Sequence, residues 1–142
     1  MPLVRFCYAD VPVLAIRSKK AVKEFIVAIF QAEGKALSDV TYIFCSDQYL
    51  LQINKTFLQH DYYTDIVSFD LSEGSQTIGE IYISVDRVKE NAVTHATEFK
   101  KEMLRVIFHG ALHLVGYKDK RKSEITNMRE KEEHYLRLFG QK

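Results

Sequence analysis

Several features of membrane, secreted and disulfide-stabilised proteins are missing from this chain. No apolar run approaches the roughly 18–20 residues that a membrane-spanning helix needs, and the first ten residues lack the apolar core of a signal peptide. The chain has only two cysteines, Cys7 and Cys45, and each lies in an apolar, strand-like run. We therefore expect a cytoplasmic protein that does not bind membranes, with both cysteines as buried free thiols rather than a disulfide.

Residues that interrupt regular structure are also scarce. The 142 residues include two prolines and six glycines, no tryptophan, and no repeat, linker or low-complexity segment. Hydrophobic residues make up 46% of the chain and charged residues 27%, which is ordinary for a globular protein. Because a chain of this length can bury a sizeable core as one unit, the sequence predicts a single domain spanning residues 1–142.

The spacing of apolar residues predicts both strands and helices. The expected strands span residues 3–8, 40–45, 65–70 and 78–84. The expected helices begin at capping residues, which are Ser18, Ser46 or Asp47, Asp86, Thr97 and Ser123. The third and fourth strands are joined by a short turn and are expected to pair antiparallel. This order predicts an α+β fold, a small mixed four-stranded sheet packed with about five helices.

One helical segment carries the residue types of a metal site. His109 and His113 are four residues apart, so both lie on one face of a helix. Gly116 is well placed to end that helix, and Asp119 is the next possible ligand. Imidazole nitrogens and carboxylate oxygens bind zinc at roughly 2.0–2.2 Å, and three protein ligands leave a fourth position open for chemistry. We predict one zinc ion per chain, held by His109, His113 and Asp119 on a zincin-like helix.

The same spacing leaves a peptidase as an alternative. Offsets of four, seven and ten from the first histidine match the pattern H-E-x-x-H-x-x-G-x-x-H of zinc peptidases. In those enzymes the glutamate after the first histidine is the general base. Here that position is Gly110, so the sequence retains the metal ligands and lacks the base.

Positive charge is concentrated around the histidine motif. Residues 98–122 contain seven Lys or Arg against three Asp or Glu, whereas residues 1–97 contain nine against twelve. A local positive potential concentrates polyanions such as nucleic acid. The residues expected to bind nucleic acid are those that flank Asp119, namely Lys118, Lys120, Arg121 and Lys122.

Three segments together match a known family pattern. His109 to Tyr117 fits H-G-x-L-H-L-x-G-Y, Asn54 with residues 64–69 fits N-x-x-x-R-x-x-x-x-P-T-D-V-L-S-F in part, and residues 79–84 fit G-D/E-I-x-I-S. They occur in the family's order. On these residues the chain resembles the YbeY family, bacterial proteins regarded as metal-dependent endoribonucleases of ribosomal RNA maturation.

The resemblance implies a metal-dependent endoribonuclease that cleaves single-stranded RNA in ribosomal RNA processing and maturation of the small ribosomal subunit. Its partner would be ribosomal RNA, with no small-molecule cofactor. Asp65 and Ser68, in the second family segment, are the candidate catalytic residues.

Two positions depart from the pattern, since the family's third histidine falls at Asp119 and its arginine at Leu58. These departures leave open a third function, a non-enzymatic, metal-containing RNA-binding module associated with the ribosome. The general base and the oligomeric state are left open.

Overall fold

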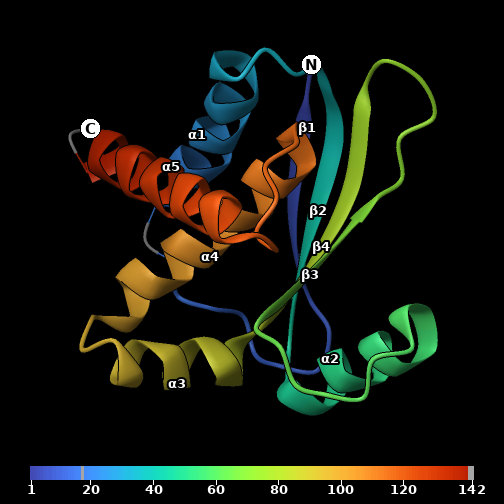
Figure 1. The fold of residues 1–142 in the computed structure, drawn as a ribbon, viewed down its shortest axis with the longest axis vertical. Helices are drawn as coiled ribbons and strands as arrows, with labels where there is room; N and C mark the ends of the chain where they lie inside the picture. Colours follow the sequence, from blue (N-terminus) through green and yellow to red (C-terminus); the bar gives the residue numbers. More distant parts are fainter. Residues whose placement is uncertain (17, 141–142) are drawn as a thin grey trace.

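The computed structural model describes residues 1–16 and 18–140, and within them a helical layer packs on one face of a sheet (Figure 1). In chain order the elements are β1 (Leu3–Tyr8), α1 (Lys19–Ala32), β2 (Leu37–Cys45), α2 (Asp47–Ile53), the π-helical turn η1 (Asn54–Leu58), β3 (Ile66–Asp70), β4 (Thr77–Ser84), α3 (Val85–Thr94), α4 (Phe99–Val115) and α5 (Lys122–Gly140). Helices α1, α4 and α5 lie on one side of the sheet. The α+β class expected from the sequence, with four strands and five α-helices, is confirmed for the described residues.

The sheet is mixed, with strand order β1-β2-β4-β3. Strands β1, β2 and β4 are parallel, and β3 pairs antiparallel with β4, as the short turn between them predicted. Gly74 lies in this turn with a φ of 132°, a left-handed conformation that glycine adopts without strain. Because β3 stands at the end of the strand order, it is an edge strand.

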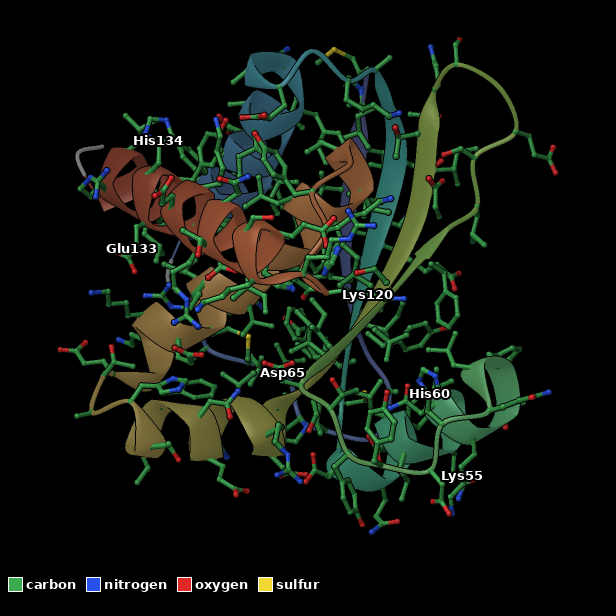
Figure 2. All side chains as sticks on the ribbon, in the orientation of Figure 1. Lys55, His60, Asp65, Lys120, Glu133 and His134 are labelled. Atoms are coloured by element: carbon green, nitrogen blue, oxygen red, sulfur yellow. The ribbon has the colours of Figure 1, made fainter. Side chains whose placement is uncertain are left out.

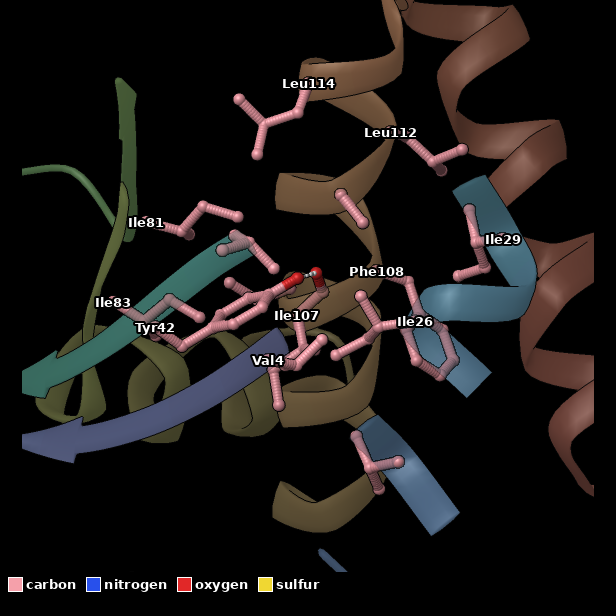
Figure 3. Close-up of a cluster of buried hydrophobic side chains, with 14 of the residues drawn as sticks. Val4, Ile26, Ile29, Tyr42, Ile81, Ile83, Ile107, Phe108, Leu112 and Leu114 are labelled. Atoms are coloured by element: carbon pink, nitrogen blue, oxygen red, sulfur yellow. Dashed lines mark hydrogen bonds between the residues drawn. The ribbon is translucent and has the colours of Figure 1, made fainter. Parts of the chain in front are cut away.

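Helix α4 lies at the centre of the core. Figure 3 shows it between side chains of the sheet and of α1; the buried residues labelled there are Val4, Ile26, Ile29, Tyr42, Ile81, Ile83, Ile107, Phe108, Leu112 and Leu114. Fully burying one large apolar side chain stabilises a fold by about 1.5–3 kcal/mol. The Tyr42 hydroxyl also donates a hydrogen bond of 2.8 Å to the Ile107 carbonyl oxygen. Packing on two sides and this bond fix the helix turn that precedes His109.

The helix starts depended on tertiary contacts as well as on local sequence. The Ser46 side chain caps α2 as expected, accepting a hydrogen bond from the Tyr49 backbone. Ser84 rather than Asp86 caps α3, because the Asp86 carboxylate instead accepts from the Asp47 backbone. Ser18 is the N-cap residue of α1, as expected, but its backbone is left-handed and its side chain makes no capping hydrogen bond. The N-cap residue of α4 is Glu98 rather than the expected Thr97. Helix α5 starts at Lys122, one residue before the expected Ser123.

The two cysteines are both free, and they differ in exposure. Cys45 is buried, as expected, beside Leu50 and Val67. Cys7 is exposed, so the prediction that it is buried was wrong. Strand β1 is an edge strand whose Val4, Phe6 and Tyr8 face the helices, which leaves the alternate position 7 on the other face of the sheet.

Within the described residues, no helix combines the length and the apolar character needed to cross a bilayer.

Candidate metal centre and cleft

The end of α4 brings three possible metal ligands together. His109 and His113 occupy successive turns of α4, with ring centroids 4.6 Å apart. Gly116 ends the helix at a φ of 120°, and the Tyr117 backbone N–H donates back to the Leu112 carbonyl oxygen. This reversal returns Asp119 toward the two imidazoles. One donor atom from each of the three residues lies within 4.8 Å of the other two.

The distances between the donor atoms fit a tetrahedral ion. Asp119 Oδ2 lies 3.3 Å from His109 Nε2 and 3.2 Å from His113 Nε2. Two ligands bound at about 2.0–2.1 Å to one tetrahedral ion are themselves about 3.3–3.4 Å apart. Both distances match the spacing of ligands on one tetrahedral ion, and the two imidazole donor atoms lie within 4.8 Å of each other, so Asp119 is well placed as a third ligand.

Helix α5 supports the first histidine from behind. Glu132 Oε2 lies 2.6 Å from His109 Nδ1, on the side of the ring opposite Nε2. Arg105 lies 3.2 Å from the other oxygen of Glu132 and also forms ion pairs with Glu102 and Glu133. A carboxylate on one imidazole nitrogen fixes the ring orientation and makes the other nitrogen a stronger ligand.

Sequence reasoning missed Glu132, although a signal was present. Met128 and Tyr135 are buried residues of the apolar stripe of α5, and Glu132 occupies the stripe position between them. An acidic residue at a core-facing helix position is rarely buried without a partner. An acidic residue within the apolar stripe of α5 is the signal that could have identified Glu132 as a site residue.

The surroundings shift the two imidazoles in opposite directions. Burial lowers the pKa of His109, but the hydrogen bond and charge of Glu132, with Asp119 and Asp65, outweigh it and raise the pKa above its ordinary value. Burial, together with the neighbouring His109, lowers the pKa of His113. His113 is therefore neutral at pH 7 and has a lone pair available for a metal.

The three ligands line a cleft of about 750 Å³ that also contains both candidate catalytic residues. Asp65 precedes β3 and accepts a hydrogen bond of 3.0 Å from the Asn91 side chain. Burial raises the pKa of Asp65, although His109 and the Asn91 hydrogen bond oppose the rise. Ser68 Oγ is shielded from solvent and has no hydrogen-bond partner among the described residues.

Of the four residues expected to bind RNA, only Lys120 lines the cleft. The other three, Lys118, Arg121 and Lys122, are exposed before and at the start of α5, and they lie outside the cleft. Arg105 and Arg129 line the cleft as well. Figure 2 shows Lys120 and Asp65 on different segments around this region. The positive side chains of the cleft thus come from several segments rather than from one basic run.

Gly110 faces away from the cleft and against the sheet. A Cβ atom at this position would lie 2.9 Å from two carbon atoms of Ile81 and 3.1 Å from Ile66 Cδ1. Gly110 is buried in α4 and does not line the cleft. The glycine that follows the first histidine therefore allows α4 to approach the sheet closely.

Comparisons with known proteins agree with this geometry. A family model described as endoribonuclease YbeY matches residues 10–140. The endoribonuclease YbeY of Cytophaga hutchinsonii is 48% identical over 124 residues, covering 87% of each chain. That of Parabacteroides distasonis is 45% identical over 130 residues, covering 92% of this chain and 91% of the relative.

A solved structure matches the fold as well. The solution structure of TM1509 from Thermotoga maritima aligns with a TM-score of 0.65 at 30% sequence identity, covering 96% of this chain and 88% of that one. The family match includes the segments that carry the three possible metal ligands, Glu132 and Asp65. The chain therefore belongs to the endoribonuclease YbeY family.

Proposed function

We propose that this chain is a zinc-dependent endoribonuclease that cleaves single-stranded RNA in ribosomal RNA processing and maturation of the small ribosomal subunit. The observation that carries the proposal is the convergence of His109, His113 and Asp119 in a cleft that Asp65 and Ser68 also line. Membership of a family named for endoribonuclease activity supports RNA as the substrate.

The donor set favours zinc, because two imidazoles and one carboxylate form an open three-ligand site of the kind that catalytic zinc uses. When bound, such an ion supplies Lewis acidity, which stabilises the negative charge that develops on a phosphate during cleavage. Glu132 serves this site by holding the His109 ring in place.

The side chains of the cleft have separate roles in the proposed reaction. Lys120 and Arg129 hold backbone phosphates through their positive charge. Asp65 accepts the proton of the attacking hydroxyl, from water or from the RNA 2′-position. The raised pKa of Asp65 makes this carboxylate a stronger base than an exposed one.

The position of Gly110 argues against the peptidase alternative. A zinc peptidase of the corresponding pattern needs a carboxylate next to the first histidine. Here Ile81 and Ile66 occupy the space that a side chain at position 110 would need.

The alternative of a non-enzymatic binding module rested on two departures from the family pattern, at Asp119 and Leu58. Asp119 Oδ2 lies 3.3 Å and 3.2 Å from the Nε2 atoms of the two histidines, a spacing that suits a third ligand. Lys120 and Arg129 line the cleft that lacks an arginine at position 58.

The test compares substrates with and without a chelator. Zinc-loaded protein is incubated with a small-subunit ribosomal RNA fragment and, separately, with unfolded casein. The variant His113→Ala removes one ligand, and His134→Ala, an exposed histidine of α5 outside the cleft, is the matched control. We expect chelator-sensitive RNA cleavage by the wild type and by His134→Ala, and none by His113→Ala.

The other outcomes identify the alternatives. Casein cleavage that is lost in His113→Ala, without RNA cleavage by any protein, would assign a metallopeptidase. RNA binding without cleavage of either substrate would assign the non-enzymatic module, with Leu58 as the first position to examine.

A further inference from the structure

An aromatic pair lines the same cleft as the three possible metal ligands, in the loop that joins η1 to β3. The rings of His60 and Tyr62 stack with centroids 5.0 Å apart and an interplanar angle of 18°. The Tyr62 hydroxyl lies 3.0 Å from His60 Nδ1. Both residues line the same cleft as the metal ligands, and Tyr62 is 57% exposed. The cleft is thus bordered by a stacked pair that leaves much aromatic surface uncovered.

The backbone holds this pair in place. The His60 N–H donates to the Asn54 carbonyl oxygen at 3.0 Å, and the Asn54 side chain donates to the Tyr62 carbonyl oxygen at 3.3 Å. Asn54 is itself buried, with 1% of its surface exposed. Gln59, between η1 and His60, has a φ of 56° and turns the chain. These bonds restrain the backbone on both sides of the aromatic pair.

An exposed aromatic stack of this kind suits the unpaired bases of single-stranded RNA. Unpaired bases are bound by stacking on aromatic side chains, because every base has a flat π-face, whereas bases in a duplex are already stacked. The phosphates that accompany the base need positive charge nearby. Lys120 and Arg129 line the same cleft and supply it. Figure 2 shows His60 and Lys120 on separate segments around the cleft.

We propose that the His60–Tyr62 pair is a base-binding subsite, on which an unpaired nucleobase near the cleaved phosphate stacks. The proposal rests on the proposed endoribonuclease function and deepens it. The subsite selects RNA that offers at least one unstacked base, and it does so without reading the sequence of that base by hydrogen bonds. Tyr62 and His60 are thus binding residues with no part in proton transfer.

The test measures how tightly the zinc-loaded full chain binds a cleavage-resistant phosphorothioate RNA. The RNA has about 12 nucleotides, a length in the range that a single-strand-binding OB fold covers. The RNA carries 2-aminopurine, whose fluorescence is quenched when it stacks. Tyr62→Leu removes the ring, and Tyr62→Phe keeps the ring while removing the hydroxyl. Tyr63→Leu is the matched control, because Tyr63 is a neighbouring exposed tyrosine outside the cleft. Thermal unfolding of each variant checks its fold.

Loss of stacking lowers affinity while leaving charge contacts intact. We expect Tyr62→Leu to bind about 5- to 150-fold more weakly, with no quenching and an unchanged salt dependence. Tyr62→Phe and Tyr63→Leu should bind and quench like the wild type, and His60→Leu should weaken binding in the same direction as Tyr62→Leu. Wild-type affinity and quenching in both Tyr62→Leu and His60→Leu would overturn the subsite alone. Failure of the wild type to bind RNA at any salt concentration would overturn the subsite together with the proposed function.

Discussion

Glu132 Oε2 lies 2.6 Å from Nδ1 of His109, so the last helix of the chain sets the orientation of the first histidine of the motif. Glu132 is only 6% exposed, and its other oxygen is held by Arg105 at 3.2 Å. The candidate metal centre therefore extends beyond the three possible ligands. It includes a buried carboxylate that is fixed by its own ion pair.

Replacing this carboxylate should weaken metal binding. We expect Glu132→Gln to lower zinc affinity by about 10- to 100-fold, the usual effect of losing such a supporting partner. Competition with a chromophoric chelator measures the affinity directly, without an activity assay. Glu133→Gln is the matched control, because Glu133 pairs with the same Arg105 without contacting His109. Equal zinc affinity in the two variants would contradict a role for Glu132 in holding the ligand.

Restoring the peptidase carboxylate should damage the fold. In Gly110→Glu the new Cβ would lie 2.9 Å from Ile81. Overpacking of a core usually costs about 1–3 kcal/mol, and the buried carboxylate adds to this cost. We expect a lower midpoint of thermal unfolding and no casein cleavage. Gly140→Glu is the control, since nothing lies within 4 Å of its Cβ position. Wild-type stability in Gly110→Glu would show that α4 can move off the sheet.

The burial of Asp65 predicts a conflict between stability and activity. Because its pKa is raised in the folded chain, the folded state holds the proton more tightly than the unfolded state does, and stability falls as pH rises through the folded pKa. We expect Asp65→Asn to raise the unfolding midpoint at pH 7, by an amount that shrinks as the pH falls toward the ordinary value of 3.8.

The same substitution should slow RNA cleavage by about 10²- to 10⁴-fold, because an amide cannot accept the proton. Unfolding curves recorded from pH 7 down to pH 4 test the stability part, and initial rates at pH 7 test the activity part. Destabilisation at pH 7 would make Asp65 a structural residue.

The position of Lys120 predicts a difference among neighbouring lysines. Lys120 lines the cleft, whereas Lys122 is exposed outside it. We expect Lys120→Ala to reduce the magnitude of the salt slope of single-stranded RNA binding by about 0.7, the effect of one lost phosphate contact. Lys122→Ala should leave the slope unchanged. Similar slopes for both variants would mean that the cleft does not define the path of the RNA backbone.

Local patterns in the sequence were sufficient to predict that three possible metal ligands lie close together. His109, His113 and Asp119 lie within eleven residues, and the glycine that reverses the chain is among them. Helix geometry and one turn thus bring the donor atoms together. Local sequence also predicted the strands, because side chains in a strand alternate between the two faces of a sheet.

Features that depend on distant segments were not predicted. Glu132 is 23 residues from His109, and its role depends on how α5 packs against α4. Asp86 does not cap α3, because its carboxylate contacts α2, and Cys7 is exposed because the outer face of an edge strand is open there. The basic residues around Asp119 are contiguous in sequence, yet the turn directs only Lys120 to the cleft.

The cleft is assembled from two stretches of chain that lie far apart in sequence. Residues 109–132 supply every candidate ligand and its support, and residues 54–70 supply the aromatic pair, Asp65 and Ser68. Substitutions in the second stretch can therefore alter which RNA is held without touching an atom that binds the ion. Leu58, which lies in that stretch, is one such position. The residues proposed to select the RNA are thus separate in sequence from those proposed to hold the ion.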